Sequence, residues 1–185
     1  MIPIRFVGVG VLAISLFVLP APSSASGACD FLKWSERSGF VRTLPPSEIA
    51  KCDRGKPSDW AECFAIAAGH YGGIEKNYFF AIQFLDCAIE HDPNEYNHYS
   101  NRAWYRYLMG YYVEALGDAE RALAMKPNQP ETLDTRGRIF AALGSQAEAI
   151  ADLRRALAIK GADMRPDAAT RLPSAQELLD SLIKR

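Results

Sequence analysis

The hydrophobic and polar positions of the chain repeat with a helical period. The clearest stretch is residues 149–159, where apolar residues recur every three or four positions and charged residues such as Asp152 fall between them. This spacing is typical of an amphipathic helix that buries one stripe and leaves the other in water. Gly110 and Gly144 interrupt such stretches where a helix must stop and reverse. The pattern therefore predicts an all-α chain built from helix-turn-helix hairpins.

The same pattern recurs along the chain with a 34-residue period. Small residues return at fixed positions, as two closely crossing helices require, because a larger side chain would hold the backbones apart. Pro93 and Pro127 mark equivalent helix ends. The columns of small residues are Gly69, Ala103 and Gly137; Ala81, Ala115 and Ala149; and Ala88, Ala122 and Ala156. Three stacked hairpins are therefore expected, at residues 62–95, 96–129 and 130–163.

The two ends of this stack need covers, because each leaves an apolar face without a neighbour. Residues 164–185 are predicted to form a linker and a capping helix, which begins with a capping box of Ser174 and Glu177. The apolar stripe of that helix contains Leu179 and Leu182. Residues 26–61, a segment that contains cysteines, are expected to cover the opposite end.

The three units resemble the tetratricopeptide repeat (TPR) family. The third unit carries the resemblance best, and the first, with an early turn expected at Gly72 and Gly73, is also similar to the Sel-like repeat. The resemblance implies a solenoid of helix-turn-helix hairpins. The stretches 101–103 and 149–153 are similar to those of bacterial repeat proteins. The matching positions of the third unit are Gly137, Phe140, Gly144, Ala149, Leu153 and Ala156.

The segment 1–25 has the pattern of a secretory signal peptide. Arg5 precedes an apolar run at residues 6–19, and small residues follow up to Ala25, after which we expect cleavage. The run is shorter than the roughly 20 residues that span a bilayer. A lipoprotein acylated at Cys29 is the weaker alternative, because Ser26 stands where leucine is usual. The expected location is periplasmic or secreted.

Export changes how the four cysteines are interpreted. An even number of cysteines in an oxidising compartment predicts two disulfide bonds. Cys63 and Cys87 are expected at similar heights in the first hairpin but pointing in different directions, which disfavours a direct bond between them. We therefore predict that Cys52 pairs with Cys63 and that Cys29 pairs with Cys87.

Composition and charge exclude other classes of protein. Of 185 residues, 49% are hydrophobic, and 21 basic residues nearly balance 22 acidic ones. Intrinsic disorder requires fewer apolar residues and more net charge. A dedicated nucleic-acid binder would show a basic face, so no nucleic-acid partner is expected.

The TPR resemblance implies a concave groove, lined by the first helix of each hairpin, that binds peptides or helices of partner proteins. Trp104 and Tyr107 would supply rigid anchors, and Asn101 a hydrogen bond to a partner's backbone. For Asp134 and Arg138, one helical turn apart, a surface ion pair is the alternative. The groove positions carried over are His70, Asn97, Ser100, Asn101, Trp104, Tyr107, Leu108, Asp134 and Arg138, together with Ile66 and Glu131.

One version of the family's groove clamps a C-terminal carboxylate of a chaperone with basic residues and asparagines. Here Ile66 and His70 replace one basic pair, and Glu131 and Thr135 replace the other. Only Asn101 matches the clamp. We therefore do not expect this chain to hold a chaperone tail.

Catalytic or metal-binding chemistry is the alternative from a different class. A loose cluster of Cys87, His91, Asp92 and His98 stands where units one and two join. Cys87 and His91 lie one helical turn apart, and together with His98 they make a possible metal-ligand set. Cys63 and His70 are a weaker thiol and base pair, because disulfide formation removes the thiolate. No phosphate-binding loop or nucleophile motif is present in the sequence. We therefore predict no enzyme, no cofactor and no metal.

The function predicted from the sequence is a protein interaction module in a bacterial cell envelope, acting as an adaptor, scaffold or assembly factor. The partner is another protein, which the sequence does not identify. Self-association through exposed apolar ends is a third possibility. The membrane is involved only through the signal peptide.

Overall fold

The computed structural model describes residues 57–160 and 173–184. Within these ranges every regular element is helical, which confirms the predicted all-α class. The predicted signal peptide, Cys29 and Cys52 lie outside the described residues. The elements are α3 (Pro57–Gly69), the π-helix η2 (His70–Ile74), α4 (Tyr78–His91), α5 (Tyr96–Leu108), α6 (Tyr112–Met125), α7 (Pro130–Leu143), α8 (Gln146–Lys160) and α9 (Ala175–Ile183).

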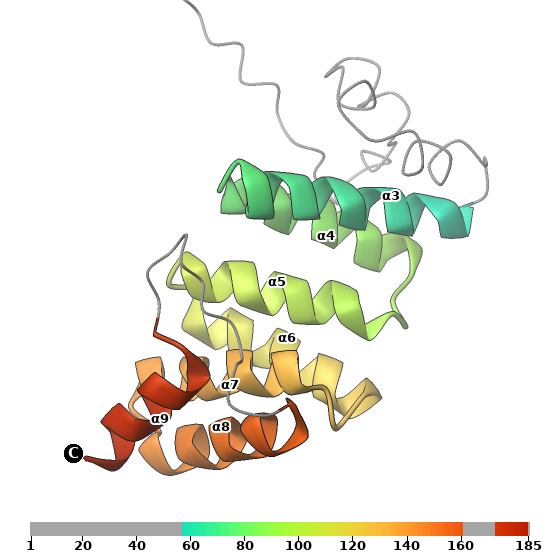
Figure 1. Cartoon of the computed structure of the whole chain (residues 1–185). Coiled ribbons are helices and arrows are strands. Elements are labelled where there is room, and N and C mark those ends of the chain that lie inside the picture. Colours follow the sequence, from blue (N-terminus) through green and yellow to red (C-terminus); the bar gives the residue numbers. More distant parts are fainter. Residues whose placement is uncertain (1–56, 161–172, 185) are drawn as a thin grey trace, which may run out of the picture.

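The described helices before α9 pair into three stacked hairpins, α3 with α4, α5 with α6 and α7 with α8 (Figure 1). The second helices begin at Tyr78, Tyr112 and Gln146, which are equivalent positions of the repeat that the sequence predicts. The helices α5 and α7 contact each other directly across the junction of the second and third hairpins. α3 begins at Pro57, before the predicted start of the first unit at residue 62.

Turns close two of the hairpins at the glycines where the pattern predicts them. Gly110 and Gly144 have φ angles of 82° and 84°, in the left-handed region that favours glycine. The first hairpin differs from the prediction, because Gly72 and Gly73 lie in η2, which continues α3. The chain reverses only afterwards, where Lys76 has φ 57° and Asn77 caps α4 by accepting a hydrogen bond from the amide of Phe80.

Most of the small residues in these columns lie buried where the two helices of a hairpin cross. Gly69 is an exception, because it is exposed and a Cβ atom there would meet nothing within 4 Å. Ala81, Ala115 and Ala149 are completely buried. At Gly137 a Cβ atom would lie 2.9 Å from Cγ of Leu153, so α7 and α8 could not approach as closely with a larger residue there. The small residues that the repeat predicts therefore set the distance between paired helices.

The first hairpin has a core of its own, in which the two described cysteines take part. Cys63 and Cys87 are completely buried in the cluster that contains Phe64 and Phe84. Both cysteines are disulfide-bonded. The predicted pairings each include a cysteine outside the described residues, so the pairings themselves stay predictions.

An arginine-carboxylate pair repeats with the same period as the helices. Arg102 donates to both carboxylate oxygens of Asp118, at 2.9 and 2.6 Å, and also to Asp86 of the preceding hairpin at 2.6 Å. Arg136 donates in the same way to Asp152, at 2.6 and 2.9 Å. Bidentate pairs of this kind fix orientation as well as adding energy. The pattern had placed Asp152 on the solvent face, and this is wrong, because the ion pair and the helix packing leave it only 6% exposed.

The predicted C-terminal cap is confirmed in α9. Oγ of Ser174 accepts a hydrogen bond from the amide of Glu177, and the Glu177 carboxylate accepts one from the amide of Ser174. Leu179 and Leu182 pack into the core cluster of the third hairpin, beside Leu153. No helix in the described ranges has the length and apolar character needed to span a bilayer.

Replacing Gly72 with alanine is expected to destabilise the first hairpin. The new Cβ would lie 2.2 Å from Cζ of Tyr105, so the Tyr105 ring would have to leave its stack on Tyr78, or η2 and α5 would have to separate. We expect a loss of about 1–3 kcal/mol in the free energy of unfolding, measured by urea titration. Gly73→Ala is the matched control, because a Cβ atom there meets nothing within 4 Å. Equal effects of the two substitutions would contradict this explanation.

Candidate functional site

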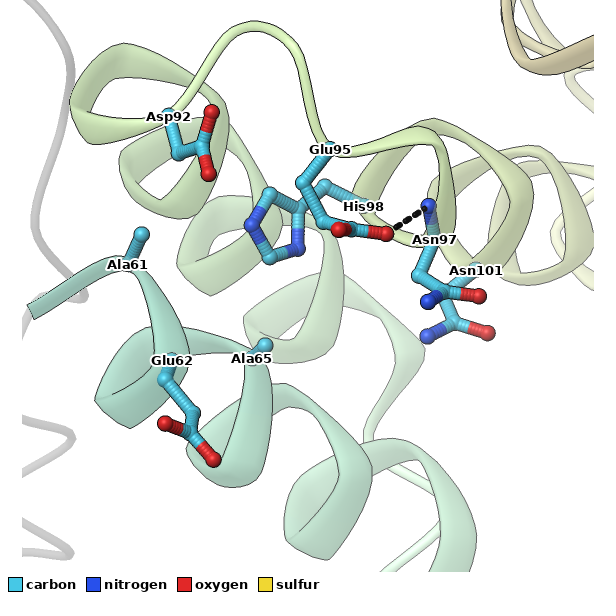
Figure 2. A pocket seen from close by; sticks show the side chains of 8 residues that line it. All are labelled: Ala61, Glu62, Ala65, Asp92, Glu95, Asn97, His98 and Asn101. Carbon is cyan, nitrogen blue, oxygen red and sulfur yellow. Dashed lines mark hydrogen bonds between the residues drawn. The ribbon is translucent and has the colours of Figure 1, made fainter. Parts of the chain in front are cut away.

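A pocket of about 400 Å³ opens between the first helices of the first two hairpins. We call it the α3–α5 pocket. One wall belongs to α3, and the other belongs to α5 and the connection that precedes it (Figure 2). Its lining residues are Ala61, Glu62, Ala65, Asp92, Glu95, Asn97, His98 and Asn101.

The connection between α4 and α5 holds two of the carboxylates by local hydrogen bonds. Oδ1 of Asp92 accepts a hydrogen bond from the amide of Asn94 at 3.1 Å. Glu95 caps α5, where its Oε1 accepts from the amide of Asn97 at 3.0 Å. Side chains that satisfy the first amides of a helix are common at this position, and negative charge there is favourable. Each carboxylate therefore has a fixed place at the edge of the pocket.

The imidazole of His98 lies between the carboxylates of Asp92 and Glu95 and faces Ala61 and Ala65 of α3 (Figure 2). The residue is only 5% exposed, and its Nδ1 atom has no hydrogen-bond partner among the described residues. Burial lowers the pKa of His98, and the charges of Glu95 and Asp92 oppose this shift. The neutral ring is therefore the favoured form near neutral pH.

The electrostatic character of the α3–α5 pocket is acidic. Glu62, Asp92 and Glu95 line it, and none of the described residues in its lining is a lysine or an arginine. Asn97 and Asn101, one helical turn apart on α5, are exposed and carry amides that both donate and accept hydrogen bonds (Figure 2). The pocket can therefore accept hydrogen bonds from a positively charged group at one side and form amide hydrogen bonds at the other.

Of the predicted groove residues, some line the α3–α5 pocket and the others lie elsewhere. Asn97 and Asn101 reach the pocket, whereas His70 lies on η2, at the far end of α3, where it contacts Glu75 at 2.9 Å. Ser100 is buried and forms a 2.7 Å hydrogen bond with Thr132, which links α5 to α7.

The aromatic anchors expected in the groove are mostly used for packing. Trp104 is only 9% exposed and stacks on Tyr107 with ring centroids 5.6 Å apart. Tyr107 packs against the cluster that contains Ile139 of α7, and burial raises its pKa. Leu108 is half-buried. The structure thus gives Trp104 little surface for a partner.

Asp134 and Arg138 form a buried ion pair, so the surface pair considered from the sequence is wrong. Nε of Arg138 lies 3.0 and 3.1 Å from the two Asp134 oxygens, and the two residues are 0% and 1% exposed. Nη1 of Arg138 donates to the carbonyl of Pro173, just before α9, at 2.8 Å. Asp134 and Arg138 are therefore not open to a partner, and Arg138 ties α7 to the residue before α9.

The alternative metal or catalytic set is not assembled. Cys87 is disulfide-bonded and offers no thiolate, and the ring of His91 stacks on Phe64 with centroids 5.6 Å apart. His98 belongs to the α3–α5 pocket instead. Among the described residues, no three His, Cys, Asp or Glu side chains are grouped so that they could hold a metal ion.

The sequence interpretation did not single out Glu62 or Glu95, and it placed Asp92 only in a loose cluster with His98. The repeat nevertheless contains a signal for Asp92 and Glu95. The position of Asp92 is occupied by Lys126 in the next unit, and that of Glu95 by Gln129. The equivalent connection thus changes from acidic to basic between the first and second junctions. Because this connection lies at the surface, hairpin packing does not dictate its residues, and a departure from the repeat there indicates a role specific to the first junction.

Comparison of the sequence with known proteins gives little. No family model matches the chain. Protein SGT1 homolog from Bos taurus is 33% identical over 64 residues, which are 35% of this chain and only 19% of that protein.

Several solved TPR domains share the architecture. The Arabidopsis OM64 TPR domain has a TM-score of 0.60 at 21% identity, over 70% of this chain and 99% of that one. The first TPR of Spaghetti (RPAP3), bound to the HSP90 peptide SRMEEVD, has a TM-score of 0.58 at 20% identity, over 67% and 90%. The second TPR domain of human RPAP3, in complex with the HSP70 peptide SGPTIEEVD, has 0.53 at 23%, over 68% and 99%. These likenesses establish the TPR fold for this chain.

Substituting Asp134 with asparagine is expected to cost about 3–5 kcal/mol of unfolding free energy, because Arg138 would remain buried without its counter-charge. The double variant Asp134→Asn with Arg138→Met also removes the arginine charge. Its free energy of unfolding should therefore fall by less than that of the single variant. Urea titration of both proteins measures the difference. Equal losses would show that the uncompensated arginine is not the cause.

His98 is expected to make stability fall with acidification. Its pKa is lowered in the folded chain, so below about pH 6.5 the unfolded chain binds more protons than the folded one. The unfolding free energy should therefore decrease from about pH 7.5 to about pH 5.5, and His98→Gln should show a smaller decrease. The carboxylates of Glu62, Asp92 and Glu95 are common to both proteins. An identical pH dependence in the variant would refute a buried neutral imidazole.

Proposed function

We propose that this protein is an exported interaction module of a bacterial cell envelope, which binds a peptide or helix of another protein on the side of the stack that carries the α3–α5 pocket. The observation that carries the proposal is the open pocket between the first helices of adjacent hairpins, with the exposed amides of Asn97 and Asn101 at its edge. Solved domains of the same fold hold peptides, as the complexes with SRMEEVD and SGPTIEEVD illustrate.

The location in the envelope rests on the sequence pattern of residues 1–25. The proposed disulfide bonds between the segment 26–61 and the first hairpin fit an oxidising compartment. In the described residues, Cys63 and Cys87 are both disulfide-bonded. An adaptor or assembly factor is the proposed role, and the pocket between the first helices of two adjacent hairpins supports it.

The proposed ligand differs from an acidic chaperone tail. The peptides in the two complexes carry adjacent glutamates and end in aspartate. The α3–α5 pocket presents Glu62, Asp92 and Glu95 on its lining. Like charges brought together in a partly buried site repel each other. We therefore expect this surface to select a ligand that is not acidic where it meets the pocket.

The proposal predicts that a partner touches α5 on the pocket side. A photoreactive amino acid placed at Asn97 or Asn101 in the full chain, expressed in its native envelope, should cross-link to the same protein, identified by mass spectrometry. Ala124, exposed on the second helix of the same hairpin, is the matched control position and should not cross-link to it.

Asn101→Ala should also reduce recovery of that protein, because it removes an exposed amide without emptying the core. Trp104→Ala is a poor choice for this purpose, because Trp104 is almost fully buried. Cross-linking that is equal at Ala124, or products that contain only two copies of this chain, would overturn the proposal.

A further inference from the structure

We propose that the α3–α5 pocket is a receptor for one positively charged side chain, an arginine or lysine of the partner, an inference that rests on the proposed function and specifies its ligand. The observations behind it are the fixed carboxylates, the buried Nδ1 atom of His98, which has no hydrogen-bond partner among the described residues, and the small residues of the facing helix.

The carboxylates at the α4–α5 connection retain hydrogen-bonding capacity. Asp92 uses Oδ1 for the amide of Asn94, and Glu95 uses Oε1 for the amide of Asn97. A carboxylate has about four acceptor sites on two oxygens, so each can also accept from a guanidinium or ammonium group. Neither carboxylate forms an ion pair with another described residue. A bound cation would therefore provide a counter-charge that the described part of the chain does not supply.

His98 gives an independent indication of a ligand. The ring lines the pocket, the residue is only 5% exposed, and Nδ1 has no partner in the described ranges. A buried polar atom without a partner costs free energy, and a donor placed beside the ring would relieve that cost. A neutral imidazole accepts a hydrogen bond from a charged donor, whereas it offers no charge to attract an anion.

The shape of the pocket fits a long side chain with a charged end. On α3, Ala61 and Ala65 present only methyl groups opposite His98 (Figure 2). The methylene stem of arginine or lysine can pack on such apolar atoms while its charged group reaches the carboxylates. The exposed amides of Asn97 and Asn101 can hold the adjacent backbone of an extended segment. The volume of about 400 Å³ is sufficient for one such side chain.

The next junction of the stack supports a site specific to this position. There, Lys126 and Gln129 replace Asp92 and Glu95, and Ser100 and Thr132 bond directly to each other between α5 and α7. The connection at the second junction is therefore not acidic, and a direct hydrogen bond links α5 to α7 there. A metal ion is a poorer occupant, because the described acidic and histidine side chains are not grouped as a metal site.

The test uses capped amino acids as probes on the isotopically labelled full chain. N-acetyl-arginine N-methylamide and its lysine equivalent should shift the NMR signals of the His98 ring and of the Asn97 and Asn101 side-chain amides. The norleucine and glutamate equivalents should not. The shifts should weaken with added salt, because the attraction is electrostatic.

Two variants test the carboxylates. Glu95→Gln and Asp92→Asn should each weaken binding of the arginine probe by about fivefold or more, in line with the loss of a charge-assisted hydrogen bond. Glu114→Gln removes an exposed charge at the start of α6 and is the matched control, for which the dissociation constant should not change.

Equal shifts with the norleucine probe, no shift with either cationic probe, or unchanged binding in both carboxylate variants would each overturn the inference. A partner cross-linked at Asn101 would in that case still support the proposed function. Conversely, binding of the cationic probes without any cross-linked partner would leave the cation receptor standing and count against the protein-binding role.

Discussion

The close approach of paired helices is the constraint on which the rest of this structure depends. It requires small residues at the crossing points, and Ala81, Ala115 and Ala149 are completely buried there. Gly137 has room for a hydrogen but not for a methyl group beside Leu153. Because these contacts recur at equivalent positions of the repeat, each hairpin presents the same face to the next, and the hairpins stack in register.

Polar links then fix how the hairpins sit on one another. The pairs Arg102–Asp118 and Arg136–Asp152 join the two helices of a hairpin, and the bond from Arg102 to Asp86 joins the first hairpin to the second. These pairs are only partly exposed, so solvent screens them less than it screens a surface pair. The stack therefore combines apolar contacts that set distance with ion pairs that set orientation.

Against this regular background, the two junctions on the pocket side of the stack differ. Between α5 and α7, a hydrogen bond joins Ser100 to Thr132, and Tyr107 packs against the cluster that contains Ile139. Arg138 is covered where it bonds to the chain before α9. Between α3 and α5, small residues on one wall and short polar side chains on the other leave a pocket. The candidate site thus lies at the junction between the first helices of the first two hairpins, where a pocket remains.

The sequence by itself determined the helical hairpins, their regular period, the glycine turns at Gly110 and Gly144 and the capping box of α9. All of these depend on residues close in the sequence or on a regular spacing, which a single chain displays directly. Only the tertiary structure decided that Asp134 and Arg138 are buried and that Glu62 lines the same pocket as Asp92, Glu95 and His98. The physical reason is that burial and electrostatic environment depend on which helices meet, and these partners come from elements far apart in the chain. The burial of Trp104 also depends on the tertiary structure. From the sequence alone, its position on the helix fits either a groove or an interface between helices.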